Sequence, residues 1–172
     1  MVILKKIKGF NMFTLIQADL TQPEHAQAYL KLMSDYASDP MGGGEDLSDF
    51  AKQHLIAALL ERNDVFIVLA FKDKQPVALL TAIEGFSTFA CKPLLNIHDV
   101  MVVKDFRGQG LTGLLFCEIE KIAKSRNCCK ITLEVLEGNE IAKNAYRKQG
   151  FSAYQLDPEF GHALFWTKSL KD

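Results

Sequence analysis

The sequence is poor in the features that mark several large classes of protein. It has no surplus of either charge: 20 Lys and Arg stand against 21 Asp and Glu, which gives a net charge of −1 at pH 7. A chain without a basic surplus lacks the field that recruits nucleic acid. It also lacks an apolar run as long as a membrane-spanning helix. We therefore expect a cytoplasmic protein with no nucleic-acid partner and no membrane partner.

Cysteine is scarce and badly spaced for metal binding. Zinc sites usually draw on pairs such as C-x-x-C, or on Cys combined with clustered His. The four cysteines are Cys91, Cys117, Cys128 and Cys129. They form no C-x-x-C pair, so we predict no metal. Buried free thiols in a reducing compartment are the expected alternative.

The length of 172 residues predicts one domain covering residues 1–172. The first eleven residues, MVILKKIKGFN, are apolar and basic. Their apolar run is too short for a secretory signal, and no small-residue cleavage site follows. Residues 1–11 are interpreted either as an extra edge strand or as an extension ahead of a start at Met12.

The stretch from Asn96 to Phe116 carries the strongest signal in the chain. A β-branched and apolar run, residues 97–103, predicts a buried strand. Glycines follow at 108 and 110, and apolar residues then recur at helical spacing from Leu111 onward. Glycines free the backbone to turn its N–H groups outward, and a helix start adds unpaired N–H donors. This combination predicts a site for phosphate or diphosphate.

The glycine loop by itself has more than one interpretation. Gly108, Gly110 and Gly113 spell G-x-G-x-x-G, and Glu134 follows near the end of the next strand, as in dinucleotide-binding proteins. A tight turn that only caps a helix is the alternative. The dinucleotide fold places its loop after the first strand, whereas most of this chain precedes the loop. That order counts against a nicotinamide-dependent oxidoreductase.

Periodicity predicts the remaining elements. Strands are expected at residues 13–18, 64–71, 75–85, 97–103, 129–135, 151–155 and 163–168. Helices are expected at residues 23–36, 47–61, from 111 onward, and 139–150. Thr21 and Glu24 suggest a capping box for the first helix, and Phe50 is expected to point inward from the second. The order β-α-α-β-β-β-α-β-α-β-β predicts an α/β protein whose mixed sheet contains antiparallel hairpins and one late parallel crossover.

A second motif, NEIAKNAYRKQGF, covers residues 139–151. With it, the chain resembles the GNAT superfamily of acetyl-CoA-dependent N-acetyltransferases. The family loop reads Arg/Gln-x-x-Gly-x-Gly/Ala, which residues 107–112 match except at Thr112. The later family motif, Asn-x-x-Ala-x-x-x-Tyr-x-x-x-Gly-Phe, is matched in full. The resemblance covers about residues 13–168 and implies a mostly antiparallel sheet of six to seven strands with flanking helices.

The resemblance also implies how acetyl-CoA is bound. The strand around Met101 and the strand at residues 131–135 would splay apart, and pantetheine would pair with the backbone between them. The backbone groups expected to hold pantetheine are those of Met101, Val102 and Val103. The residues expected around the diphosphate are Arg107, Gly108, Gln109, Gly110, Leu111, Thr112 and Gly113. The later motif adds Asn139, Ala142 and Tyr146 to the cofactor-binding set.

The expected reaction is direct attack of a primary amine on the thioester in a ternary complex. An alkyl amine has a pKa of about 10, so a base must take its proton near neutral pH. His98, in the central strand, is the first choice, with Glu84 and Glu134 in reserve. Tyr146 is at the position of the family's general acid and would protonate the departing thiolate. The backbone N–H near Met101 is the expected oxyanion donor.

The acceptor is expected under the connection between the first two helices, as the resemblance implies. This connection carries Asp39, three glycines and further acids at Glu45, Asp46 and Asp49. Its acidity favours a small cationic amine, such as a polyamine or a basic amino acid. The alternatives are an acyl-CoA-binding module without turnover and the nicotinamide-dependent oxidoreductase. A homodimer is common in the family and is expected here.

Overall fold

The protein is described here from a computed structural model that covers residues 2–6 and 12–170, with side chains from Phe13 to Leu170. Its internal contacts divide the chain into two compact units, Met1–Leu133 and Glu134–Asp172. Each unit is therefore described by itself. The single domain of residues 1–172 stays a prediction.

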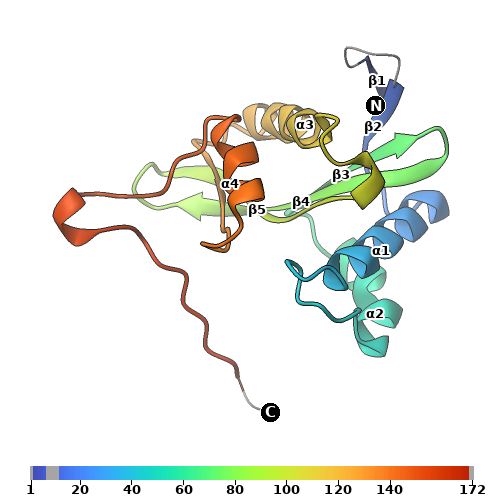
Figure 1. Ribbon diagram of the computed structural model, residues 1–172, viewed down its shortest axis with the longest axis horizontal. Helices are drawn as coiled ribbons and strands as arrows, with labels where there is room; N and C mark the ends of the chain where they lie inside the picture. The colour runs from blue at the N-terminus through green and yellow to red at the C-terminus, as the bar shows by residue number, and fades with distance from the viewer. Residues whose placement is uncertain (1, 7–11, 171–172) are drawn as a thin grey trace. The chain divides into compact units, whose positions relative to one another are not determined.

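The first unit is built on a six-stranded sheet whose strands lie in sequence order (Figure 1). The strands are β1 (Val2–Lys6), β2 (Met12–Gln17), β3 (Val65–Lys72), β4 (Gln75–Ser87), β5 (Lys92–Val102) and β6 (Ile131–Leu133). Neighbours from β1 to β5 pair antiparallel, and β6 pairs parallel with β5. The predicted mixed, mostly antiparallel sheet is confirmed. The extra edge strand is confirmed for residues 2–6, while residues 1 and 7–11 lie outside the described part.

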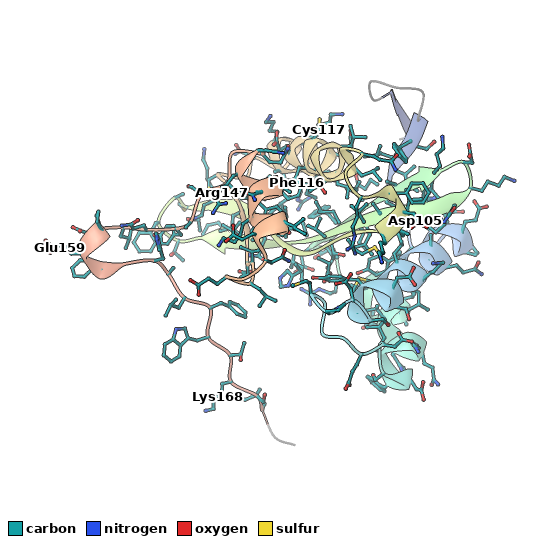
Figure 2. All side chains as sticks on the ribbon, in the orientation of Figure 1. Asp105, Phe116, Cys117, Arg147, Glu159 and Lys168 are labelled. Atoms are coloured by element: carbon teal, nitrogen blue, oxygen red, sulfur yellow. The ribbon has the colours of Figure 1, made fainter. Side chains whose placement is uncertain are left out.

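Helices cover both faces of this sheet (Figure 1). On one face, α1 (Pro23–Ala37) and α2 (Asp49–Leu60) join a core in which Leu32 packs with Leu69, Leu79 and Met101. On the other face lies α3 (Leu111–Ser125), which follows a short 3₁₀ turn, η1 (Lys104–Phe106). Its apolar stripe is buried and includes Phe116, whereas the adjacent Cys117 is exposed (Figure 2). Burial of both faces is the main source of stability for such a layered arrangement.

Two predictions about the first helices are wrong. Helix α1 begins one residue later than a Thr21 cap requires: its N-cap is Gln22, and the Thr21 hydroxyl donates to Asp19 instead. In α2, Ser48 accepts from Ala51 N–H as a true cap, but Phe50 is 72% exposed and stacks on His54. An aromatic ring can lie on another surface side chain, so hydrophobicity alone does not fix which way it points.

The β4–β5 hairpin is longer than the sequence predicts. The predicted strands cover residues 75–85 and 97–103, yet pairing extends to Ser87 and Lys92 at the tip of the hairpin. The hairpin also contains a register shift between Thr81 and Ala82. With this extension at the hairpin tip, β5 has eleven residues.

The second unit contains one helix, α4 (Glu140–Arg147), and a 3₁₀ turn, η2 (Pro158–Phe160). The strands predicted at residues 151–155 and 163–168 are absent from the described chain, where an isolated bridge joins Gln155 and His162. Leu164, Phe165 and Trp166 are exposed. Their apolar character suits a strand, but a strand also needs a pairing edge, which periodicity does not supply.

The cysteine prediction is corrected by the structure. None of the four cysteines forms a disulfide, but Cys91, Cys117 and Cys129 are exposed and Cys128 is half-buried. Across residues 2–6 and 12–170, no helix combines the length and the apolarity needed to cross a membrane.

Candidate active site

The candidate site begins where strands β5 and β6 stop pairing. Parallel pairing between β5 and β6 covers only residues 95–97 of β5 and 131–133 of β6. Strand β5 nevertheless continues to Val102, still paired with β4. Its last residues therefore have a strand on one side and an open backbone edge on the other. This is the arrangement expected for a binding site that takes an extended ligand.

The backbone groups at this open edge can be assigned from alternation. The Val103 N–H donates to the Val77 carbonyl at 2.9 Å, so it faces β4 and is occupied. Antiparallel strands alternate the side to which successive residues direct their N–H and C=O groups. Met101 consequently also faces β4, while Val100 and Val102 face the open edge. The amides of Met101 and Val103 thus face β4, contrary to the expectation that they are open to a ligand. For Val102, which faces the open edge, binding of a ligand stays a prediction.

A β-bulge lies just before this edge. Thr81 on β4 is opposite Asp99, and Ala82 is opposite Ile97, so His98 is the extra residue. A bulge bends its strand and re-aims the side chains next to it. His98 is exposed here, and it can be reached by a solute.

The end of β5 leads through η1 into the glycine loop. Gly108 and Gly110 have φ angles of 76° and 79°, values that side-chain-bearing residues rarely adopt. Gly110 is the N-cap of α3 and provides no side chain. The first bond inside the helix is donated by Leu114 to Gly110, so the amides of residues 111–113 point out of the helix start. These groups fit an anion such as a diphosphate.

Arg107 has partners that the sequence did not suggest. Its Nη2 donates to Asp39 Oδ2 at 2.7 Å, and its Nε donates to the Val102 carbonyl at 2.9 Å. Arg107 therefore joins the connection between α1 and α2 to the open edge of β5. The neighbouring Gln109 uses its side-chain amide to bond the Asp105 carbonyl.

A buried polar chain ends at the bulge. The hydroxyls of Tyr29 and Thr81 share a hydrogen bond of 3.1 Å, and Thr81 is also bonded to the Asp99 carboxyl. Thr81 has one hydroxyl proton, so when it donates to Asp99 it accepts from Tyr29. Burial raises the pKa of Asp99, with the Thr81 bond and the His98 charge opposing the rise. Burial likewise raises the pKa of Tyr29 to about 12.

Tyr36, at the end of α1, lies near two acids. Burial is the main reason its pKa is raised, and the charges of Asp99 and Asp39 add to the effect. Asp99 and Asp39 are therefore both close enough to Tyr36 for their charges to act on its hydroxyl. Asp99 is not among the predicted site residues, because strict alternation assigns His98 and Asp99 to opposite faces and no sequence pattern reveals the bulge at His98.

Of the two reserve bases, Glu84 is committed to another contact. Glu84 is ion-paired with Arg126, whose hydrogen bond lowers the Glu84 pKa; such a carboxylate is a poor proton acceptor. Arg126 also lies over the Phe66 ring, 4.7 Å from its centroid. Glu134 is an exposed residue of the second unit.

In the second unit, the motif forms a capped helix. Asn139 accepts from the Ala142 N–H at 3.1 Å, which fixes the start of α4. Tyr146 is half-buried one residue before the helix ends, with its ring centroid 6.3 Å from that of Phe151. The Phe151 N–H donates to the Tyr146 carbonyl, and Gly150 has a positive φ of 87°, as in a glycine C-cap. Asn139 and Ala142 thus have structural roles here whatever else they bind.

A hollow of about 460 Å³ lies elsewhere in the first unit, between α1 and strands β2–β4. Its walls include His25, Lys31, Phe71 and Lys74. It shares no residue with the bulge, the open edge or the glycine loop. We therefore do not assign the site to it.

Comparison with known proteins agrees with this geometry. The family model described as "Acetyltransferase (GNAT) family" matches residues 28–151. A probable acetyltransferase of known structure is 20% identical, with 91% of this chain and 99% of that chain covered and a TM-score of 0.75. An aminoglycoside acetyltransferase from an uncultured soil metagenomic sample, in complex with sisomicin, is 16% identical, with 92% and 97% covered and a TM-score of 0.74.

A third similar structure is AAC(6')-Iy in complex with a bisubstrate analog, CoA-S-monomethyl-acetylneamine. It is 15% identical, with 92% of this chain and 99% of that chain covered and a TM-score of 0.72. At these identities the structures establish a shared fold. The family match, which spans most of the chain and both units, establishes more: the chain belongs to the acetyltransferase (GNAT) family and is an N-acetyltransferase.

The raised pKa of Asp99 predicts a stability signature. The folded protein binds a proton at Asp99 more readily than the unfolded chain, whose Asp titrates near 3.8. Stability from this group is therefore fully present below pH 3.8 and is lost as pH rises through the folded pKa. Asp99→Asn should be more stable than the wild type at pH 7, and the difference should vanish below pH 3.8. Urea unfolding at a series of pH values measures this.

The control for this experiment is Asp105→Asn, which changes an exposed acid in η1 (Figure 2). It should not reproduce the pH-dependent gain. If Asp99→Asn were less stable than the wild type at every pH, the carboxylate would be a net stabilising group and its assignment to a strained site would be wrong.

Proposed function

We propose that the protein transfers an acetyl group from acetyl-CoA to a primary amine of a small, cationic molecule by direct attack in a ternary complex. The observation that carries this proposal is the open edge of β5 and the helix start that follows it. Strand β5 ends at Val102, and α3 begins soon after, at Leu111. One segment thus offers strand-like pairing for an extended arm and amide donors for a diphosphate. The family's use of acetyl-CoA supports the same donor.

The donor would be held almost entirely by backbone. Val100 and Val102 direct N–H and C=O groups to the open edge, where the pantetheine amides can pair with them. The amides of Gln109 through Gly113 would take the diphosphate, and Gly108 gives the loop its turn. Thr112 contributes a hydroxyl in the first turn of α3, where a Thr is well tolerated. We propose the Val100 N–H, in place of Met101, as the oxyanion donor.

Proton removal is proposed for His98. The amine nitrogen forms a bond to the acetyl carbon, the carbon–sulfur bond breaks, and the amine gives up a proton. Histidine, with an ordinary pKa of about 6.5, can accept that proton near neutral pH. Its exposed location at the bulge supports the assignment. Asp99, the next residue, lies close enough for the His98 charge to act on its carboxyl.

Thiolate protonation is proposed for Tyr146. A phenol, with an ordinary pKa of about 10, remains protonated at pH 7 and can donate to a thiolate of about 8.5. After transfer, the phenolate is reprotonated from solvent. The assignment rests on the complete motif of residues 139–151 and on this chemistry.

The acceptor is proposed to bind near Tyr36, Asp99 and Asp39. Two carboxylates close to one half-buried phenol favour a cationic amine over a neutral or anionic one. Aminoglycosides, which similar folds bind, are one class of small polyamine with this character. The cytoplasmic location and the homodimer remain predictions from the sequence.

The first test separates donor classes and detects turnover. Acetyl-CoA should raise the melting temperature by mass action, whereas NAD should not. A panel of amines should then release free thiol from acetyl-CoA, with cationic polyamines and basic amino acids ahead of neutral amines. Stabilisation without thiol release from any amine would favour the non-catalytic acyl-CoA-binding module. Stabilisation by NAD alone would favour the oxidoreductase.

Tyr146→Phe tests the general acid. The substitution removes the hydroxyl and keeps the ring, so acetyl-CoA affinity should be unchanged while kcat falls at least about 10-fold, the lower side of acid–base contributions. Steady-state kinetics and calorimetric titration measure the two quantities. Tyr154→Phe, an exposed tyrosine of the same unit, should have wild-type kcat. An unchanged kcat in Tyr146→Phe removes Tyr146 from the mechanism.

His98→Ala tests the general base. Amines of pKa about 10 carry a proton at neutral pH, so the loss of a base should reduce activity chiefly below pH ~8 and much less at higher pH. The pH dependence of kcat/KM measures this. His54→Ala, an exposed histidine on α2, is the control and should keep the wild-type profile. If His98→Ala kept that profile as well, the proton would have another acceptor.

A further inference from the structure

Arg107 and Asp39 form a contact that neither motif explains. Arg107 belongs to the glycine loop, and Asp39 belongs to the α1–α2 connection, yet their side chains are 2.7 Å apart. The hydrogen bond from Arg107 is the main reason the Asp39 pKa is lowered, so the carboxylate is held in its charged form. The Asp39 side chain is 23% exposed and that of Arg107 is 50% exposed. The pair therefore lies at the surface, within reach of solutes.

Asp39 also organises the connection around it. Its Oδ1 accepts from Met41 N–H at 2.9 Å, and its backbone carbonyl accepts from Gly42 at 2.7 Å and Gly44 at 3.1 Å. Gly42 is packed so tightly on α1 that a Cβ there would lie 2.0 Å from the Tyr36 carbonyl oxygen. The connection is thus fixed to the end of α1 independently of Arg107. Release of Arg107 would free one carboxylate oxygen without dismantling the loop.

Arg107 is hydrogen-bonded to a backbone group that acetyl-CoA would need. Its Nε occupies the Val102 carbonyl, which faces the open edge of β5. A ligand that pairs along this edge needs the same carbonyl. Arg107 is also three residues before Gly110, the N-cap of α3, so its guanidinium is close in sequence to the proposed diphosphate cradle. A diphosphate carries more negative charge than one carboxylate and accepts bidentate bonds from Arg.

We propose that Arg107 and Asp39 form a latch that couples the donor to the acceptor. When the donor is absent, Arg107 occupies Val102 and neutralises Asp39. Donor binding takes the Val102 carbonyl and draws the guanidinium to the diphosphate, which exposes the Asp39 carboxylate. Asp39 then binds the ammonium group of the acceptor, so the amine binds well only after the donor. This inference rests on the proposed function and adds to it a specificity residue and an order of binding.

The ion pair of Arg107 and Asp39 is weak enough for a ligand to break. Exposed ion pairs contribute little to stability because solvent screens them and side-chain freedom opposes them. A ligand can therefore break this pair with a small part of its binding energy. Asp99 is unsuited to the same role, because burial holds it among Thr81 and Tyr29.

Binding of coenzyme A to Asp39→Asn is the decisive test. The substitution removes the carboxylate that competes for Arg107, so coenzyme A should bind about 2- to 5-fold more tightly than to the wild type, the range set by an exposed ion pair. Calorimetry measures this. Pantetheine, which lacks the diphosphate, should gain much less. The gain should disappear in Asp39→Asn combined with Arg107→Gln, because Arg107 carries the coupling.

Asp35→Asn is the matched control, since it removes one acidic charge one turn away on α1. Its partner is Lys31, so coenzyme A affinity should change less than in Asp39→Asn. An equal gain in coenzyme A affinity in both variants would mean that the effect comes from the loss of any nearby negative charge. Weaker binding of coenzyme A to Asp39→Asn would make Asp39 a structural anchor. Either result overturns the latch.

The acceptor half of the proposal is tested with the best amine from the thiol-release panel. Asp39→Asn should raise its KM at least about 10-fold with a smaller change in kcat, and Asp39→Glu should restore part of the loss. A KM like that of the wild type overturns the role of Asp39. If the wild type bound no coenzyme A, or no amine released thiol, the proposed function itself would fail. Failure of the latch alone leaves coenzyme A binding and turnover intact.

Discussion

The loss of strand pairing beyond Ile97 is the constraint on which the site depends. Backbone N–H and C=O groups need partners, and a sheet normally supplies them on both sides of an internal strand. Here β6 ends at Leu133, while β5 continues to Val102 with β4 on one side only. The bulge at His98 lies at the same point and adds one residue to β5 alone. An edge left open within a sheet is a ready pairing surface for another extended molecule, and the helix start of α3 follows directly.

The polar chain of Tyr29, Thr81 and Asp99 shows what the fold tolerates at this point. Apolar side chains fill the rest of that face, and a carboxyl there loses hydration. Hydrogen bonds from Thr81, with Tyr29 behind it, offset part of this loss. The pKa of Asp99 is still raised, because these hydrogen bonds do not fully replace the lost hydration. Ionisable groups with shifted pKa values are common at functional sites. The location of Asp99 beside the bulge is consistent with this.

Sequence reasoning reached the strand, the glycine loop, the helix and most of the sheet, because each has a local signature. Leu111 begins α3 as periodicity predicts, and Gly110 has the positive φ that a glycine is suited to. The predictions from sequence were wrong where a structure depends on a pairing partner elsewhere in the chain. The alternation of residues 151–168 suggests strands, but no pairing edge is found within the described chain. The bulge at His98 could not be predicted because it depends on how two strands pair, and Asp99 was missed as a result. The directions of the Met101 and Val103 amides likewise depend on pairing with β4. The pairing of Arg107 with Asp39, 68 residues apart, has no sequence signal at all.

That long-range pair also explains how a site made largely of rigid backbone can respond to a ligand. The open edge of β5 is fixed by β4, and the proposed diphosphate-binding loop is fixed by α3, so neither can move far without loss of packing. The buried chain at Asp99 is equally constrained. Arg107 is different: its guanidinium is exposed and its two contacts are with groups that a ligand can replace. Any adjustment that donor binding imposes will therefore fall on Arg107 first. Because the other end of that contact is Asp39, where we propose that the amine binds, the adjustment would be transmitted to the acceptor.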